Sequence, residues 1–187
     1  MADDRHGTDD VDDETLDAVA EALRTAETGV ALTGAGVSTA SGIPSFRGDD
    51  GIWERHDPAD FHRRRLDADP AGFWADRISL RESIYGDLDP EPNAAHEALA
   101  GLESAGHLDA VLTQKDEAQR LARDSDVFLA VGSSLSVQPA SLLPKIAAEA
   151  GSTLVVINYE ETPRDASAAH VLRADVTHVL PAIVERV

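Results

Sequence analysis

The segment from Val30 to Ser38 reads Val-Ala-Leu-Thr-Gly-Ala-Gly-Val-Ser, an uncharged run that breaks into a glycine-rich turn. Short continuous apolar runs are typical of strands that are buried on both faces of a sheet. Glycines directly after such a strand let the backbone turn sharply and approach a ligand closely. The segment therefore predicts a buried parallel strand followed by a tight turn.

Similar apolar runs recur further along the chain, separated by stretches with helical spacing. The predicted strands after the first are 109–113, 126–131 and 153–157, and the predicted helices between and after them are 93–104, 117–123, 139–150 and 174–186. Strands that alternate with helices in this way form a parallel sheet with helices on both faces. We therefore expect an α/β fold, a Rossmann-like doubly wound parallel sheet.

The remaining parts of the chain complete the predicted domain organisation. Residues 1–13 are mostly acidic and predict a disordered tail, whereas 14–187 predict one domain that opens with a helix. Within this domain, 48–70 is polar and irregular and predicts a long loop or lid with one helical turn. A helix is expected at 73–85.

Three predicted strands end in small or polar residues, at Thr33 to Ser38, Gly132 to Leu135 and Asn158 to Glu160. In open parallel sheets, ligands bind outside the carboxyl ends of the strands, where the strand order reverses. Backbone amides of glycine turns suit a pyrophosphate, and Asn or Glu suits ribose hydroxyls. However, the first turn departs from the usual G-x-G-x-x-G pattern, because its sixth position is Thr39. Taken alone, these turns fit a nucleotide site and purely structural tight turns equally well.

The charge balance is strongly acidic, with 35 acidic residues against 16 basic ones and a net charge of −19. Such a surface repels nucleic acid and anionic membranes, so neither is expected as a partner. Self-repulsion of this size is reduced by salt, which predicts a halophilic source. No apolar run approaches the roughly 18 residues of a membrane helix, and no signal peptide is recognised, so a cytoplasmic location is expected.

The chain contains no cysteine, which excludes disulfides, a thiol nucleophile and zinc sites built from cysteine. Among the seven histidines, His56 and His62 lie on the predicted loop at a spacing that does not argue for a metal. His96 is interpreted as a structural residue of its helix. No metal site is therefore expected.

The longer string from Gly34 to Gly48 reads Gly-Ala-Gly-Val-Ser-Thr-Ala-Ser-Gly-Ile-Pro-Ser-Phe-Arg-Gly. It resembles the signature of the sirtuins, the NAD-dependent protein deacylases, nearly residue for residue. Later motifs, from Thr113-Gln114 to Gly132-Ser-Ser-Leu135 and Val179-Leu-Pro181, follow in the family's order. The resemblance extends over about 29–181. It implies NAD as the cofactor, 48–92 as a loop and helical lid over that cofactor, and an acyl-lysine protein as substrate.

The resemblance also implies which residues bind NAD or ADP-ribose. Those expected at the phosphates and the ribose next to them are Gly34, Ala35, Gly36, Ser38, Gly132, Ser133 and Ser134. Those expected at the nicotinamide end are Ile43, Phe46 and Arg47, and Gln114 belongs to a further family motif. Those expected at the adenosine end are Asn158 and Glu160, near its ribose, and Val176, near the adenine.

One part of the family pattern is missing. Sirtuins follow their T-Q-N-I/V-D motif with a helix, then a His-Gly pair that supplies a general base, then a four-cysteine zinc module. Here Gln114 runs directly into Lys115-Asp116-Glu117, and only 12 residues separate Thr113 from Asp126. That length holds one crossover helix between parallel strands. No histidine replaces the general base by motif, so no catalytic residue is assigned.

Three functional hypotheses follow. The first is a sirtuin homologue that binds NAD or ADP-ribose and is catalytically impaired. The second is an active deacylase or NAD-cleaving enzyme whose base comes from elsewhere, such as a partner chain. The third is a non-enzymatic interaction protein that keeps the fold, against which the retained Phe46 and Arg47 count. The run from Arg63 to Arg65 is consistent with an acidic partner or with a solvated helical face.

Overall fold

The computed structural model describes residues 11–47, 51–86, 88–112 and 115–187. The chain divides into two compact units. Residues 1–37 and 93–187 form one, here called the sheet unit, and residues 38–92 form the other, here called the helical unit. The predicted acidic tail lies largely outside the described residues, although Asp12 and Asp13 already cap and begin the first helix.

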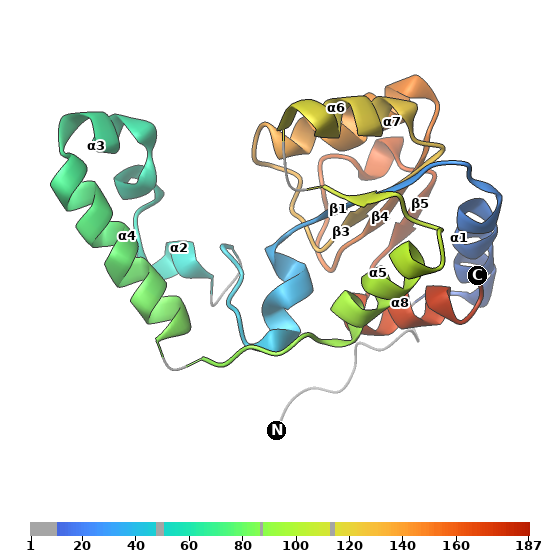
Figure 1. Ribbon diagram of the computed structural model, residues 1–187, viewed down its shortest axis with the longest axis horizontal. Helices are drawn as coiled ribbons and strands as arrows, with labels where there is room; N and C mark the ends of the chain where they lie inside the picture. The colour runs from blue at the N-terminus through green and yellow to red at the C-terminus, as the bar shows by residue number, and fades with distance from the viewer. Residues whose placement is uncertain (1–10, 48–50, 87, 113–114) are drawn as a thin grey trace. The chain divides into compact units, whose positions relative to one another are not determined.

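The sheet unit contains five parallel strands in the order β2-β1-β3-β4-β5 (Figure 1). Their bounds are β1 Gly29–Thr33, β2 Ala110–Val111, β3 Val127–Val131, β4 Thr153–Ile157 and β5 His170–Leu172. The predicted parallel α/β sheet is confirmed. β2 is shorter than predicted, and β5 was missed because three residues at the edge of a sheet leave too little pattern to detect.

Helices cover both faces of this sheet (Figure 1). Those on one face are α1 Asp13–Thr25, α5 Ala94–Ser104 and α8 Val176–Val184, and those on the other are α6 Lys115–Asp124 and α7 Leu143–Ala150. The described part of this unit also contains 3₁₀ segments: the seven-residue η2 Ala35–Ser41, which runs on into the helical unit, and the single turns η4 Ala140–Leu142 and η5 Asp165–Ser167.

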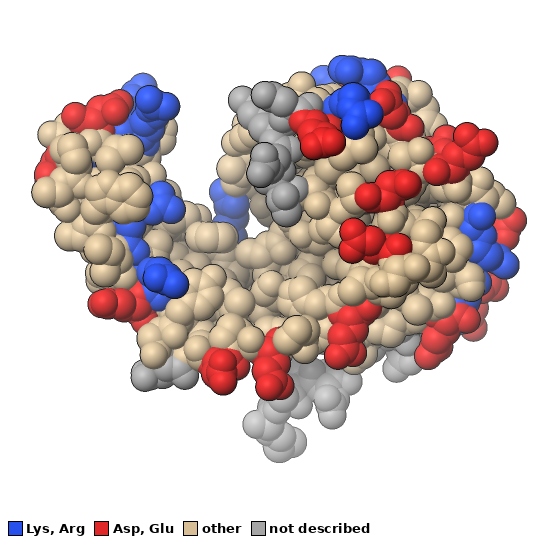
Figure 2. Space-filling view, viewed as in Figure 1, with Lys and Arg blue, Asp and Glu red and all other residues tan. Residues whose placement is uncertain are grey.

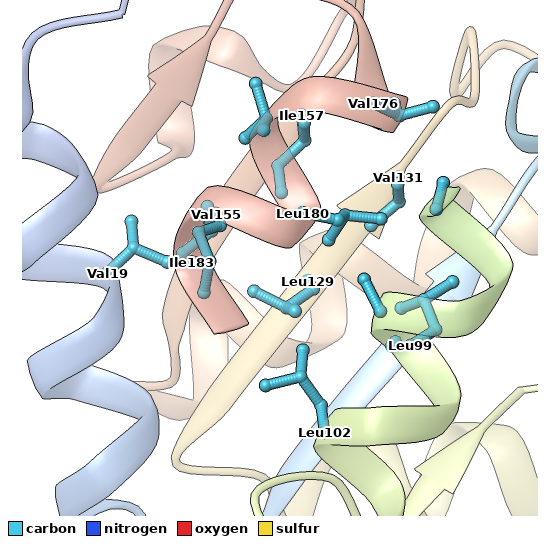
Figure 3. Packing of buried hydrophobic residues seen from close by; sticks show 14 of the residues in the cluster. Val19, Leu99, Leu102, Leu129, Val131, Val155, Ile157, Val176, Leu180 and Ile183 are labelled. Atoms are coloured by element: carbon cyan, nitrogen blue, oxygen red, sulfur yellow. The ribbon is translucent and has the colours of Figure 1, made fainter. Parts of the chain in front are cut away.

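Strand β3 is buried on both faces, as its continuous apolar sequence predicted. Leu129 and Val131 pack with α5 and α8 on one face (Figure 3), and Phe128 packs with α6 and α7 on the other. All three side chains are almost fully buried. Residues in a strand alternate between its faces, so this one strand contributes to two separate apolar layers.

The N-terminus of α5 is capped as predicted. The Asn93 side chain accepts hydrogen bonds from the amides of Ala95 at 3.0 Å and His96 at 3.3 Å. His96 Nδ1 in turn accepts from the Asn93 amide at 3.2 Å. This reciprocal arrangement is a capping box, and it confirms the structural interpretation of His96.

The helical unit contains α2 Ile52–Arg55, η3 Pro58–Phe61, α3 Arg63–Ala68 and α4 Pro70–Tyr85. The helix predicted at 73–85 is confirmed, but the irregular loop predicted at 48–70 is wrong for most of the described residues. Two of the short helices there have side-chain caps. For η3, Asp57 accepts from the amide of Ala59, and for α3, His62 Nδ1 accepts from the amide of Arg64 at 3.3 Å. Arg63 to Arg65 form the first turn of α3.

Charge differs between the two units. The sheet unit has 23 acidic and 9 basic residues, and the helical unit has 12 acidic and 7 basic residues, so most of the net negative charge lies on the sheet unit. Figure 2 shows acidic side chains spread across the visible face of the sheet unit. Within the described part of the chain, no helix is long and apolar enough to cross a membrane.

Candidate functional site

The strand order points to the edge of the sheet between β1 and β3 as the candidate ligand site. The chain passes from β1 to β2 on one side, then crosses back to β3 on the other side and continues outward through β4 and β5. The order therefore reverses between β1 and β3, and ligands bind outside the carboxyl ends of the strands at such a point. The turns 34–37 and 132–135 follow these two strands directly.

These two turns are in direct backbone contact. The Gly34 amide donates to the carbonyl of Val131 at 2.8 Å, and the Gly36 amide donates to the carbonyl of Gly132 at 2.9 Å. A Cβ atom on Gly34 would lie 2.4 Å from the Gly132 oxygen, and one on Gly132 would lie 2.6 Å from the Val37 nitrogen. Gly132 also has a positive φ of 57°, which side chains with a Cβ atom disfavour. Glycine is thus required at these positions by the contact between the turns, before any ligand is considered.

A third strand end lies beside them, because β4 pairs with β3 in the sheet. Asn158, directly after β4, is only 8% exposed, and its side-chain amide donates to the carbonyl of Glu160 at 2.8 Å. The same carbonyl accepts a hydrogen bond from Arg173 Nη1 at 2.6 Å. Val176, the first residue of α8, is buried in the apolar layer that α8 shares with β3 and β4.

Arg173 also pairs with Asp165. Partial burial raises the pKa of the Asp165 carboxyl, but hydrogen bonds from the hydroxyl and amide of Thr162 and the charge of Arg173 outweigh burial. The net effect holds this pKa below its ordinary value, so the carboxylate stays charged at neutral pH. Sequence reasoning missed both residues, since nothing in the primary pattern links positions 165 and 173.

The donors at this edge fit the phosphates and ribose of a dinucleotide. The half-buried hydroxyls of Ser133 and Ser134 lie in the β3 turn, where Ser133 Oγ accepts weakly from the Leu135 amide at 3.4 Å. Neither turn contains a carboxylate that would repel phosphate. The element after β1 is the 3₁₀ helix η2.

The site residues expected at the nicotinamide end belong to the helical unit. The Ile43 amide donates to the carbonyl of Ser38 at 3.3 Å. Phe46 is 44% exposed, and its ring centroid lies 5.3 Å from that of Trp53. Backbone bonds from Ile52 to Ser45 and from Trp53 to Phe46 bring the two sides of this loop together. Arg47 is exposed, and Gln114 lies outside the described residues.

Residues 34–122 match the Sir2 family. The NAD-dependent protein deacetylase of Haloarcula marismortui is 66% identical over 259 aligned positions, with all of both chains covered. The chain belongs to the Sir2 family. A second sirtuin, the NAD-dependent protein deacetylase of Saccharolobus solfataricus, is 30% identical over 239 positions, which cover 90% of this chain and 96% of the relative.

Solved structures agree with the family and the fold. One reported in a study of the mechanism and regulation of Sir2 enzymes gives a TM-score of 0.82 at 27% identity, covering 94% of this sirtuin and 98% of that chain. Another, described as Sir2 with a p53 peptide and NAD⁺, gives a TM-score of 0.76 at 26% identity. That match covers 90% of this chain and 96% of the other. Several similar structures are described as complexes with ADP-ribose.

This sirtuin is shorter than its relatives within the aligned region. The alignment to the Haloarcula deacetylase has 259 positions against 187 residues, so 72 positions have no residue here. The alignment to the Saccharolobus deacetylase has 239 positions and covers 90% of this chain, which is about 168 residues. About 70 of its positions therefore have no residue in this chain. Over the part of the chain that the structure describes, no group of three or more histidine or acidic side chains is placed to hold a metal ion.

Proposed function

We propose that this sirtuin binds NAD or ADP-ribose at the carboxyl edge of the sheet unit and that the chain, as it stands, is impaired in deacylation. The observation that carries the first part is the position of the turns after β1, β3 and β4, which follow neighbouring strands at the carboxyl edge where the strand order reverses. The deacetylase relatives and the NAD⁺ and ADP-ribose complexes of similar structures support the same ligand.

The residues proposed to bind are those that the family resemblance implies. The two glycine turns would line the phosphates, the hydroxyls of Ser133 and Ser134 would donate to them, and Asn158 with Glu160 would bind the adenosine ribose. The full set is Gly34, Ala35, Gly36, Ser38, Ile43, Phe46, Arg47, Gln114, Gly132, Ser133, Ser134, Asn158, Glu160 and Val176. Residues 48–92 would act as the lid of a single domain, 14–187. NAD, when bound, would supply the ribose carbon that the acyl oxygen of an acyl-lysine attacks, with nicotinamide as the leaving group.

The proposed impairment rests on the missing general base. Only 12 residues separate Thr113 from Asp126, and α6 occupies 115–124 of them. His96 is engaged in the cap of α5 and is therefore a poor substitute. A general base contributes about 10²–10⁴-fold to such reactions, so we expect turnover to fall by about that factor.

A non-enzymatic protein that keeps the fold is the second candidate, and one observation favours it. The contact between the two turns explains Gly34, Gly36 and Gly132 without any cofactor. A scaffold that has lost NAD would retain these glycines for packing alone. The exposed Phe46 and Arg47 argue for the first candidate, because a scaffold has no need of them.

The deciding experiment is a calorimetric titration of NAD and of ADP-ribose into the protein in molar KCl, followed by a nicotinamide-release assay with an acetyl-lysine peptide. We expect binding of at least one ligand and little release. Rapid release would contradict the proposed impairment and would favour a base from elsewhere. If the folded protein binds neither ligand, the scaffold hypothesis holds. Gly101→Ala is a suitable control, because its new methyl group meets no atom within 4 Å.

A further inference from the structure

The connection between β4 and β5 is held by a side chain from beyond β5. Arg173 donates from Nη1 to the carbonyl of Glu160 at 2.6 Å and pairs through Nη2 with Asp165. The Glu160 carbonyl also accepts from the Asn158 side chain at 2.8 Å. One carbonyl oxygen therefore receives a charged donor and a neutral donor, which fixes the peptide unit between them.

Asp165 is itself held in place. Its Oδ1 accepts from the hydroxyl of Thr162 at 2.5 Å, and its Oδ2 accepts from the Thr162 amide at 2.9 Å. The side chains of Arg173 and Asp165 are 33% and 21% exposed, whereas those of the Arg120–Glu117 pair are 62% and 72% exposed. Solvent and salt screen a partly buried pair less than an exposed one. The Arg173 network is therefore less screened than an exposed ion pair, and it restrains the Glu160 carbonyl.

We propose that Arg173 and Asp165 are positioning residues for the adenosine ribose. By fixing the Glu160 carbonyl, Arg173 holds the Glu160 and Asn158 side chains where they bind the ribose hydroxyls. This inference rests on the proposed binding of NAD or ADP-ribose. The competing explanation is a brace that stabilises the loop and has no bearing on the ligand.

The test compares two ligands that differ only at the adenosine ribose: ADP-ribose and its analogue that lacks both hydroxyls of that ribose. For Arg173→Gln, we expect the affinity for ADP-ribose to fall about tenfold, about the value of one hydrogen bond between the Glu160 carboxylate and a ribose hydroxyl that is no longer held in place. The affinity for the analogue should change less than twofold. Arg173→Lys should recover part of the loss, because one ammonium does not match the fork of a guanidinium.

Arg186→Gln is the matched control. Arg186 also joins a carbonyl to carboxylates, with Nη1 2.7 Å from the Ala182 oxygen and Nη2 2.7 Å from Asp13. It follows the C-terminus of α8, and α8 runs back from the carboxyl edge of the sheet, so it lies at the opposite edge. We expect this variant to bind both ligands like the parent protein.

The outcomes separate the two proposals. If the parent protein binds neither ligand, the proposed function fails, and this inference fails with it. If the parent binds ADP-ribose but Arg173→Gln weakens both ligands equally or neither, binding stands and the positioning role is overturned. Asp165→Asn provides a second, isosteric variant should Arg173→Gln not fold, and we expect about a threefold loss that is again confined to ADP-ribose.

Discussion

The sheet unit and the helical unit differ in how they bury apolar side chains. Over the described residues, 34 hydrophobic side chains are buried in the sheet unit, and Ile52 and Phe73 are buried in the helical unit. Burial of apolar surface is the dominant favourable contribution to folding. The sheet unit therefore has a core that accounts for its fold, whereas the helical unit has almost none.

The helical unit depends on local and surface interactions instead. Rings of Phe46, Trp53 and Phe61 form a short aromatic series, and Arg65 pairs with Asp69 at 2.6 Å on the surface. Exposed ion pairs contribute only about 0–1 kcal/mol each. We therefore expect the helical unit to open at a lower free energy than the sheet unit. In hydrogen exchange, its backbone amides should exchange before those of the sheet unit.

The variant with the largest expected effect tests the contact between the 34–37 and 132–135 turns of the sheet unit. Gly132→Ala places a methyl group against the backbone of Gly36 and Val37 at a residue with positive φ. We expect a loss of about 3 kcal/mol or more in the free energy of unfolding, together with loss of ADP-ribose binding. Denaturant unfolding in molar KCl measures the loss of stability, and calorimetric titration measures the loss of binding. Gly101→Ala in α5 should be neutral or slightly stabilising, and equal losses in the two variants would contradict the packing argument.

A pair of core variants tests the comparison between the units directly. Leu129→Ala should lower the global free energy of unfolding by about 2–5 kcal/mol. Phe73→Ala should leave that transition within about 0.5 kcal/mol, because Phe73 belongs to the helical unit and to neither apolar cluster of the sheet core. Hydrogen exchange should instead show lost protection confined to 63–85. A common transition that shifts equally in both variants would mean that the units unfold together.

The pH dependence of the sheet unit should include Asp165. Because its pKa is depressed in the folded state, its contribution is complete above the unfolded value of about 3.9 and is lost as the pH falls through the lower folded-state pKa. We expect Asp165→Asn to lower stability by about 1 kcal/mol at pH 7, with the difference narrowing toward pH 3. Denaturant unfolding at several pH values measures this difference. A difference in the free energy of unfolding that stays constant from pH 7 to pH 3 would contradict the depressed pKa of Asp165.

The smallest expected effect concerns Asp69 in the helical unit. Hydrogen bonds from Arg65 and from the Gly72 amide lower the pKa of its carboxyl, but the side chain is 50% exposed. Raising KCl should therefore move the Asp69 pKa back toward its ordinary value, while that of Asp165 changes less. Carboxyl resonances followed by NMR at two salt concentrations measure both. Equal salt sensitivity would remove this distinction between the units.

Much of the fold was predictable because the relevant signals are local. The uncharged run at Val30 to Thr33 predicted a buried strand, and Asn93 followed by helical spacing predicted a capped helix. Alternation of such segments predicted the parallel sheet and, through it, the edge at which the strand-end turns meet. The assignment of individual residues to NAD remains a prediction that rests on family resemblance.

The sequence by itself therefore determined four of the five strands, their parallel arrangement and the small residues at their ends. Only the tertiary structure decided which turns touch: a Cβ atom on Gly34 would lie 2.4 Å from the Gly132 oxygen, which makes glycine obligatory there. It also revealed β5, the short helices of 52–68 and the Arg173 network. The physical reason is range: propensity and periodicity act over a few residues, whereas these features depend on contacts between segments that only the folded sheet or the helical unit brings together.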